Sequence, residues 1–390
     1  MSGRRGTTTD TACAGVGFPT LSPVPQSVLH PVRRPARTVA HLLVLLAVAV
    51  GAAVALAPSS AHAMAKGLMD ENMPRNGDDA TRLEFYTVAA ESNVKFLRTF
   101  VHWDGKHDFA FPHEIESIRR MANEAPHIQI DTLFVGWNGE LGRRYKDARR
   151  VPLNRYRKMV RQTVKALQDV PIRIIWSPWN EANYQTQLPK KHGPEVWRKM
   201  QNIAYDEIKK IDPDALVVAG ELAPYARNKR TSTDPGLWLR RGLGLNAAWK
   251  PLRGTKRKDY EVKADAITLH SYDYKNDPAK RLSSKYEWTI RNLSKTRSIL
   301  KKIGRTKRIR ARAVERLYIT EFGYIFKGSQ AISEEQAATW LERSWNIAKR
   351  NKIRGMLWFQ VRDPERVFFS GLRTAEGVDR AVLPVFRTLE

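Results

Sequence analysis

The feature that most constrains this sequence is a regular alternation of short apolar segments with helical ones, from about residue 66 to residue 361. The clearest apolar segment, IRIIW at 172–176, does not alternate with polar residues, which is typical of a strand buried on both faces. No two of these segments are joined by a hairpin turn. The expected strands cover residues 66–70, 94–103, 128–137, 172–181, 215–221, 264–272, 316–321 and 353–361.

The segments between the strands carry helix start signals and helical spacing. Asp78-Asp79 can cap a helix over 80–92, and Pro152 precedes apolar residues spaced three and four apart. Further helices are expected at 112–123, 194–211, 286–303 and from Ser333, with a short one at 237–241. Eight alternations without hairpins predict an α/β fold and favour a closed (β/α)8 TIM barrel. A doubly wound open sheet is the alternative, but no glycine-rich phosphate turn follows the first strand.

The first 63 residues form an N-terminal extension that has the order of a secretory signal peptide. Arg33, Arg34 and Arg37 precede the apolar run Leu42–Leu56, and the small-residue site Ala61-His62-Ala63 follows. The apolar run is short for a membrane span, which needs about 20 residues, so we expect no stable span after cleavage. An uncleaved N-terminal anchor is the alternative. Residues 64–390 are expected to form a single catalytic domain, secreted or associated with the cell envelope.

Cysteine content and net charge limit the kinds of chemistry and the kinds of partner that this chain can have. The only cysteine, Cys13, lies in the expected signal, so the mature chain has no disulfide and no thiolate chemistry. The formal net charge is +27. Such a charge predicts attraction to polyanions, such as acidic polysaccharide, an anionic wall polymer or nucleic acid, unless it only reflects a solvated arginine-rich surface.

Two glutamates stand at the ends of expected strands. Trp179-Asn180-Glu181 follows the strand at 172–176, where Pro178 has no N–H to continue the ladder, and Glu321 ends the strand at 316–321. All strands of such a barrel open on one face, so the two carboxylates should meet at one mouth. One protonated carboxyl and one carboxylate are what cleavage of a glycosidic bond requires. Taken singly, each glutamate could instead be a helix cap or a solvated loop residue.

These residues resemble a known clan. Trp179-Asn180-Glu181-Ala182-Asn183 is similar to the fourth-strand motif of the (β/α)8 retaining glycoside hydrolases of clan A, with families 5 and 39 most similar. The segment 319–323, ITEFG, resembles the clan's nucleophile motif on the seventh strand. Ala182 departs from the pattern, because several families have proline there. The matches span about residues 66–361. They include Arg98 on the second strand, His270 and Tyr272 on the sixth and Trp358 on the eighth.

The resemblance implies roles for the matched residues. Glu181 would be the general acid and base, and Glu321 the nucleophile that holds the glycosyl group covalently. Asn180 would donate to the sugar 2-hydroxyl. Arg98 and Tyr272 would hydrogen-bond Glu321 and keep it ionised.

Other expected substrate contacts are His270, several tryptophans and one further glutamate. His270 would contact the sugar or Glu181. Trp358 is expected under the sugar, while Trp103, Trp137 and Trp179 would form either subsites or rim packing. Glu221, which ends the strand at 215–221, is the best rival carboxylate and could bind substrate hydroxyls. Carboxylates that follow other strands without a tryptophan-asparagine context are Asp104, Asp273 and Asp363.

The sequence indicates no cofactor and no metal site. His113-Glu114 begins like a zinc-binding helix motif, but Ser117 stands where the second histidine would be. Neither a phosphate-binding loop nor a serine-nucleophile elbow is present.

Two basic regions remain. Residues 295–316 hold ten lysines or arginines at the end of the barrel opposite the mouth, either as a solvated face or as a surface for an anionic wall or matrix polymer. Nucleic acid is disfavoured, because no aromatic residues are interleaved. The long segment 224–263 leaves the catalytic end of the fifth strand and could shape a subsite for acidic sugars. Its basic residues include Arg227, Lys229, Arg230, Arg240 and Arg241.

The sequence therefore predicts a secreted retaining β-glycoside hydrolase that acts on a poly- or oligosaccharide by double displacement. The alternative from another class is a barrel without turnover that binds cell-wall or extracellular glycan.

Overall fold

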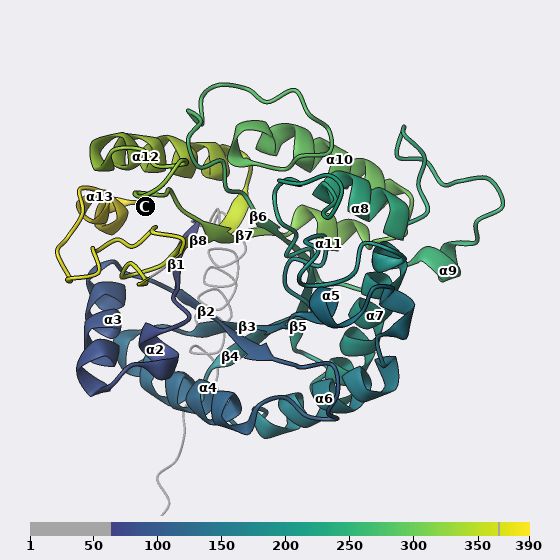
Figure 1. Cartoon of the computed structure of the whole chain (residues 1–390), viewed down its shortest axis with the longest axis horizontal. Helices are drawn as coiled ribbons and strands as arrows, with labels where there is room; N and C mark the ends of the chain where they lie inside the picture. Colours follow the sequence, from purple (N-terminus) through teal and green to yellow (C-terminus); the bar gives the residue numbers. More distant parts are fainter. Residues whose placement is uncertain (1–63, 366) are drawn as a thin grey trace, which may run out of the picture. The chain divides into compact units, whose positions relative to one another are not determined.

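Eight parallel strands close into a barrel surrounded by helices, which confirms the predicted (β/α)8 TIM fold (Figure 1). The computed structural model describes residues 64–365 and 367–390. The predicted N-terminal extension and signal peptide, residues 1–63, lie outside the described residues. The strands are β1 (Ala65–Met69), β2 (Phe96–His102), β3 (Thr132–Asn138), β4 (Arg173–Ser177), β5 (Leu216–Ala219), β6 (Ala266–His270), β7 (Leu317–Phe322) and β8 (Ile353–Phe359).

The helices lie outside the ring of strands (Figure 1). The caps predicted from sequence are present: Asp78 Oδ1 accepts from Thr81 N at 2.8 Å, and Ser333 Oγ accepts from Gln336 N at 3.2 Å. No helix among residues 64–365 and 367–390 is both long and apolar enough to cross a membrane. The α-helices are α2 (Met73–Asn76), α3 (Asp79–Glu91), α4 (Pro112–Glu124), α5 (Leu141–Arg144), α6 (Leu153–Ala166), α7 (Gly193–Ile211), α8 (Pro235–Gly242), α9 (Arg257–Tyr260), α10 (Leu293–Arg305), α11 (Ala311–Glu315), α12 (Glu334–Arg350) and α13 (Val382–Thr388).

The barrel interior is filled by one side-chain cluster. The ring of Phe134 on β3 lies 5.4 Å from the ring of Tyr318 on β7. These strands are not neighbours, so their side chains must meet inside the barrel. Because strand residues alternate between faces, this contact identifies which positions point inward. The buried members of the cluster are Phe134, Ile175, Val218, Ala266, Tyr318 and Leu357.

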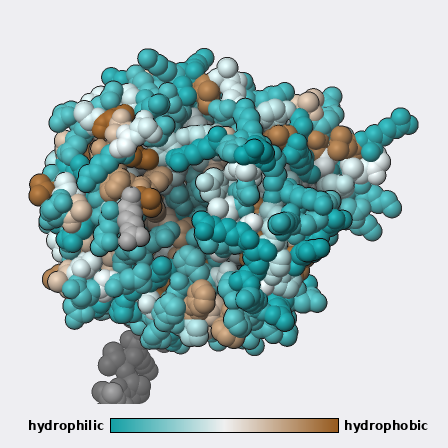
Figure 2. Space-filling view, viewed as in Figure 1, coloured by the Kyte–Doolittle hydropathy of each residue, from teal (hydrophilic) through white to brown (hydrophobic). Residues whose placement is uncertain are grey.

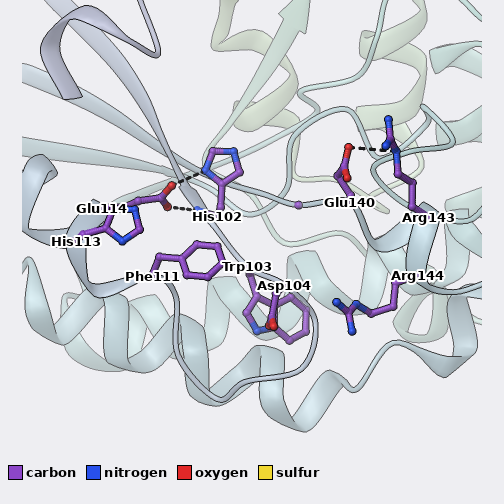
Figure 3. A pocket seen from close by; sticks show the side chains of 10 residues that line it. His102, Trp103, Asp104, Phe111, His113, Glu114, Glu140, Arg143 and Arg144 are labelled. Atoms are coloured by element: carbon purple, nitrogen blue, oxygen red, sulfur yellow. Dashed lines mark hydrogen bonds and ion pairs between the residues drawn. The ribbon is translucent and has the colours of Figure 1, made fainter. Parts of the chain in front are cut away.

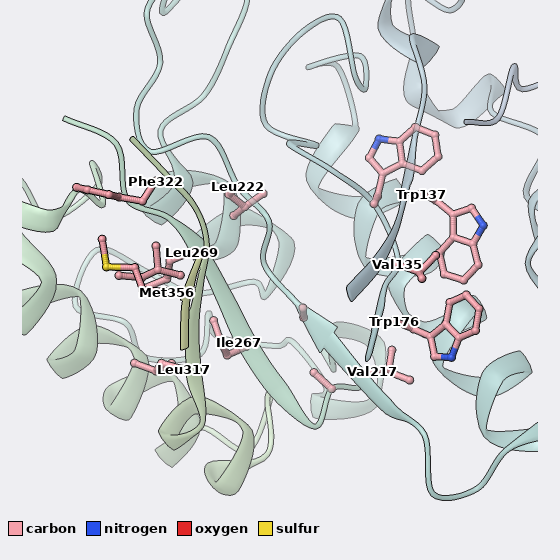
Figure 4. Close-up of a cluster of buried hydrophobic side chains, with 14 of the residues drawn as sticks. Val135, Trp137, Trp176, Val217, Leu222, Ile267, Leu269, Leu317, Phe322 and Met356 are labelled. Carbon is pink, nitrogen blue, oxygen red and sulfur yellow. The ribbon is translucent and has the colours of Figure 1, made fainter. Parts of the chain in front are cut away.

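The opposite strand faces pack against the helices in a larger core (Figure 4). Trp137 on β3 and Trp176 on β4 stack there with ring centroids 5.1 Å apart. Both tryptophans point away from the barrel axis, because their inward neighbours are Phe134 and Ile175 by alternation. The same alternation decides which residues can reach the mouth.

Helix α10 begins later than the sequence predicted. The helix was expected from Tyr286 but starts at Leu293. Asn292 keeps residues 284–289 out of the helix: its Oδ1 accepts from Thr289 N at 3.0 Å, and its Nδ2 donates to Ser284 O at 2.9 Å. A 3-10 turn, Ile290–Asn292, leads into α10. Five short helices were not predicted: α2, α5, α9, α11 and α13.

The basic segment 295–316 is not uniformly solvated. Arg308 is 1% exposed, and its guanidinium donates to Gly244 O at 3.1 Å and to Thr255 Oγ1 at 2.5 Å. This arginine therefore holds the loop after α8 against the barrel, whereas lysines such as Lys301 and Lys302 are exposed.

We expect Phe134→Ala to lower the free energy of unfolding by about 3–5 kcal/mol, because it removes a fully buried ring at the centre of the barrel. Leu83→Ala is the control, since Leu83 is 68% exposed and should cost less than about 0.5 kcal/mol. Urea unfolding curves of both variants measure the difference. Equal losses would contradict the interior packing described here.

Candidate active site

A cavity of about 290 Å³ opens at the carboxyl ends of the strands. The surface seen in the view of Figure 1 is mostly hydrophilic and is hollowed near its centre (Figure 2). Carboxylates, amides and aromatic rings from strands far apart in sequence converge there. The lining residues are Glu71, Asn138, Asn180, Glu181, Tyr184, Gln187, Ala223, Pro224, Tyr225, Arg227, Tyr272, Tyr274, Glu321, Phe359 and Phe368.

Glu181 and Glu321 lie together in this cavity. One carboxylate oxygen of each, with one ring nitrogen of His270, forms a group whose members are all within 4.8 Å of one another. His270 Nδ1 lies 3.0 Å from Glu181 Oε1 and 3.5 Å from Glu321 Oε2. The two residues are 140 positions apart in the sequence, and the barrel brings their side chains to one mouth, as the sequence predicted.

A β-bulge in β7 turns Glu321 toward the mouth. Leu269 pairs with Ile319, but the next residue of β6, His270, pairs with Glu321, so Thr320 is passed over. Thr320 and Glu321 consequently both reach the site, although strict alternation would send one of them outward. Thr320 Oγ1 donates to Glu221 Oε1 at 3.0 Å.

Glu181 and Glu221 both adopt left-handed backbone conformations, with φ of 39° and 49°. Such conformations are costly for residues other than glycine and cluster at functional sites. Glu181 N donates to Glu221 O at 2.6 Å, so the two strained segments support each other. Gly220, with φ of 124°, precedes Glu221 where a Cβ would come within 2.2 Å of Thr268 O. The chain therefore needs glycine at this position to turn Glu221 inward.

Arg98 is the central cation of the site. It is 1% exposed, and its Nη1 donates to Glu321 Oε1 at 2.5 Å. Its Nη2 pairs with Glu221 and also donates to Asn180 Oδ1 at 3.0 Å. One guanidinium thus fixes side chains from β7, from the segment after β5 and from the segment after β4.

His270 is the second cation. Burial disfavours charge on the ring, but Glu321, Glu181 and Glu221 outweigh it and raise the pKa of His270 to about 9. Its Nε2 lies 2.9 Å from Glu221 Oε2, so the charged ring donates to Glu221 as well as to Glu181. Although burial would raise the pKa of Glu221, the charges of Arg98 and His270 lower it to about 2.

Glu181, His270 and Glu321 are also residue types that can bind a metal ion. Both ring nitrogens of His270 already lie at hydrogen-bond distance from carboxylates, and the raised pKa favours a protonated ring. A metal-binding imidazole must be neutral. The three side chains therefore fit a hydrogen-bonded network better than a metal centre.

Tyr272 completes the contacts to Glu321. Its hydroxyl donates to Glu321 Oε2 at 3.1 Å. Burial, reinforced by the charge of Glu321, raises the pKa of Tyr272 well above its usual value, so the phenol keeps its proton. Its ring stacks on Tyr274 at 5.3 Å.

The structure does not bring the predicted tryptophans into this cavity. Trp137 and Trp358 are 0% and 1% exposed and face the helices, so the expectation that their rings bind substrate is corrected. On β8 the alternation instead directs Phe359, one residue later, to the cavity. Trp179 is buried against Trp103, with centroids 6.3 Å apart.

Several cavity residues were missed by the sequence analysis. Glu71 follows β1 as Glu221 follows β5, so the same signal could have found it, but the first strand was the weakest of the eight patterns. Burial and the charge of Glu321 raise the pKa of Glu71. Tyr274 and Phe368 carry no sequence signal of their own. Among the five basic residues named for the segment 224–263, only Arg227 lines the cavity.

A second hollow of about 600 Å³ lies beside the first, at the ends of β2 and β3 (Figure 3). Trp103 lines it, and the ring Nε1 donates to His107 O at 2.8 Å. Glu114 faces His102 rather than His113, with Oε1 2.8 Å from His102 Nδ1. Asn138 Nδ2, on the wall of the catalytic cavity, lies 3.4 Å from His102 Nε2, so the two hollows share a rim.

Comparison of the sequence with protein-family models and with curated proteins gave no match. Solved structures do resemble the chain. A family 39 glycoside hydrolase from Bacteroides cellulosilyticus matches with a TM-score of 0.59 and 14% identity over 84% of this chain. A monomeric β-xylosidase from Caulobacter crescentus gives 0.56 and 14% over 83%, and a family 5 xyloglucanase from Paenibacillus pabuli gives 0.55 and 12% over 84%.

The matches cover 64%, 67% and 98% of those three chains, so this chain spans less than two thirds of the first. At these identities the likeness concerns the fold. Two of these three structures are named as members of families 39 and 5, the two families that the sequence motifs had indicated.

We expect the stability that His270 contributes to depend on pH. Its pKa of about 9 in the folded chain exceeds the usual 6.5, so the charged ring stabilises the fold fully below pH 6.5. That contribution disappears as the pH rises through about 9. The difference in unfolding free energy between the wild type and His270→Gln should therefore shrink by up to roughly 3 kcal/mol between pH 6 and pH 10.

Urea unfolding of both proteins at pH 6, 8 and 10 measures this difference. Groups that do not contact His270 are common to both proteins and cancel. A difference that stays constant over the range would mean that His270 is not charged in the folded chain.

Proposed function

We propose that this chain is a retaining β-glycoside hydrolase. The observation that carries the proposal is the spacing of Glu181 and Glu321, whose nearest oxygens lie within 4.8 Å of each other. Retaining enzymes place their carboxyl groups about 5–5.5 Å apart, whereas inverting enzymes leave about 6.5–9.5 Å for a water molecule. The barrel shared with family 39 and family 5 glycoside hydrolases supports the same reaction class.

In the first step Glu321 attacks the anomeric carbon while the bond from that carbon to the leaving oxygen breaks. Glu181 gives its proton to the leaving oxygen, and the glycosyl group becomes an ester of Glu321. Arg98 and Tyr272 each donate to a different oxygen of Glu321, which orients the carboxylate before attack.

In the second step water attacks the anomeric carbon from the side that the leaving group vacated. Glu181 now accepts the proton of that water, and the carbon–oxygen bond to Glu321 breaks to restore the carboxylate. His270 keeps Glu181 in place through Nδ1. Glu221 carries no reacting atom in this scheme, because its carboxylate is bound by Arg98, His270 and Thr320.

Asn180 is the residue proposed to bind the sugar 2-hydroxyl. Its Oδ1 accepts from Arg98 Nη2 at 3.0 Å, which leaves the amide N–H groups free to donate. A bond from this amide would strengthen as positive charge develops on the sugar ring. The side chain is 6% exposed, so its orientation is fixed before substrate arrives.

We propose that the protein is secreted or held at the cell envelope, which rests on the order of residues 33–63. The exposed lysines and arginines of segment 295–316 would retain it on an anionic wall or matrix polymer. A barrel that binds glycan without turnover remains the alternative, and turnover of any aryl β-glycoside decides against it.

Trapping with 2-deoxy-2-fluoro glycosides tests the nucleophile. The fluorine slows both steps and an activated leaving group speeds only the first, so the covalent ester accumulates on the attacking carboxylate. We expect the label on Glu321 after digestion and mass spectrometry of the peptides. Label on Glu221 would overturn the assignment.

Glu181→Gln tests the acid and base. We expect turnover of glycosides with a poor leaving group to fall by about 10²–10⁴-fold, the usual contribution of general acid catalysis. The first step on 2,4-dinitrophenyl glycosides should be spared, because that leaving group needs no proton. Glu195→Gln, on the exposed side of α7, is the control and should leave both rates unchanged. Equal losses with both leaving groups would exclude Glu181 as the acid.

A further inference from the structure

The catalytic cavity contains one cation that the mechanism does not use. Among the lining residues in the described part of the chain, Arg227 is the only lysine or arginine. Its guanidinium lies 5.0 Å above the ring of Tyr274. The groups that favour its charge are the phenols Tyr274 and Tyr225, and no described carboxylate pairs with it.

The position of Arg227 is fixed relative to the reacting atoms. Tyr274 stacks on Tyr272 with the ring planes 16° apart, and the Tyr272 hydroxyl donates to Glu321. Phe368 packs edge-on against both tyrosine rings, at 5.2 and 5.8 Å. The rings of Tyr274 and Tyr272 therefore lie between the Arg227 guanidinium and Glu321. Because these rings are packed, the guanidinium loses less conformational entropy when it binds a ligand.

The carboxylates of the site do not need this cation. Glu321 and Glu221 already pair with Arg98, and Glu181 contacts His270. The remaining carboxyl of the cavity, Glu71, follows β1, across the barrel from the segment after β5 that carries Arg227. Arg227 thus adds positive charge to one side of the cavity without neutralising a neighbour.

The loop that carries Arg227 also holds Lys229 and Arg230, and Lys190 Nζ donates to Arg230 O at 3.3 Å. Two nearby acids are engaged elsewhere: Asp234 Oδ1 accepts from Ala226 N at 2.8 Å, and Asp273 pairs with Arg291 at 2.5 Å. Burial and the charges of Asp234 and Asp273 raise the pKa of Glu287, while the charge of Lys229 opposes this shift. This side of the protein therefore carries charges of both signs, and Arg227 is the basic residue among them that lines the cavity.

We propose that the sugar bound in this cavity carries a carboxylate, as uronic acids do, and that Arg227 binds that carboxylate. The proposal rests on the proposed glycoside hydrolase function and narrows its substrate class. A planar guanidinium matches a carboxylate with two parallel N–H···O bonds. Arg227 also hydrogen-bonds the side chains of Tyr225 and Tyr274, which engages only some of its five N–H groups. A neutral sugar would offer no negative charge to pair with the Arg227 guanidinium.

The test compares substrates that differ only in the charged group. Rates are measured on 4-nitrophenyl β-D-glucuronide against the β-D-glucoside, on the β-D-galacturonide against the β-D-galactoside, and on uronate-containing polysaccharides against their carboxyl-reduced forms. We expect the wild type to favour the acidic member of at least one pair by tenfold or more in kcat/KM. Sulfated neutral sugars form a separate arm, and a preference for these over uronates would overturn the assignment to a carboxylate.

Arg227→Gln should lower kcat/KM for the acidic member by about 10–100-fold and change the neutral member less than about threefold. Arg241→Gln is the matched control, because Arg241 lies in the same segment 224–263 and is exposed but does not line the cavity. Equal losses on both members, or a wild type that prefers neutral members, would overturn the proposal.

Failure of hydrolysis can be separated from failure of this inference. Calorimetric titration measures binding of uronate oligosaccharides and of their carboxyl-reduced forms to the wild type and to Arg227→Gln. Binding that needs both the carboxylate and Arg227, without turnover of any substrate, would sustain the inference and reject the hydrolase. No binding, or equal binding of both forms, would reject the inference.

Discussion

The rest of the site depends on the buried guanidinium of Arg98. It pairs with Glu321 and with Glu221 and donates to Asn180. One rigid group therefore holds side chains from β7 and from the segments after β5 and β4. Buried charges are tolerated only when paired, and removal of one partner leaves the others uncompensated. Together with His270, this arginine lets several carboxylates lie close together in one cavity. The cavity is therefore organised before any ligand arrives, which is what electrostatic preorganisation requires.

The two-residue period of the strands determines whether most other side chains face the barrel interior or the helices. Positions that alternate with the inner cluster of Phe134 and Leu357 face the helices, which explains why Trp137 and Trp358 pack in the outer core. Two devices break this pattern at the mouth. The bulge in β7 brings consecutive residues to the site, and the left-handed backbone at Glu181 and Glu221 turns side chains inward after their strands have ended.

Much of this arrangement was predictable from the sequence. The alternation of apolar segments was sufficient for the barrel, because eight strand–helix units have few other ways to bury their strands. Glu181 and Glu321 were predicted from their places at strand ends, and Arg98, His270 and Tyr272 from the resemblance to clan A. The structure brings all five into one network. The tryptophans were misplaced because a motif gives no inward or outward direction without the register. Arg227 was named with four other basic residues of an irregular segment, and Tyr274, in a turn, was missed. Neither segment has a periodicity from which the position or the neighbours of a side chain can be predicted.

The bulge in β7 also bears on how related chains can be recognised when little identity remains. Because of the bulge, the direction of the Glu321 side chain depends on the number of residues that precede it in β7. One residue more or fewer would leave a plausible apolar strand but would turn the carboxylate toward the helices. Substitutions along β7 are thus far easier to accommodate than insertions or deletions. Chains that share this barrel can diverge widely in composition, yet those that keep the chemistry must conserve the residue count between the start of the seventh strand and its terminal glutamate.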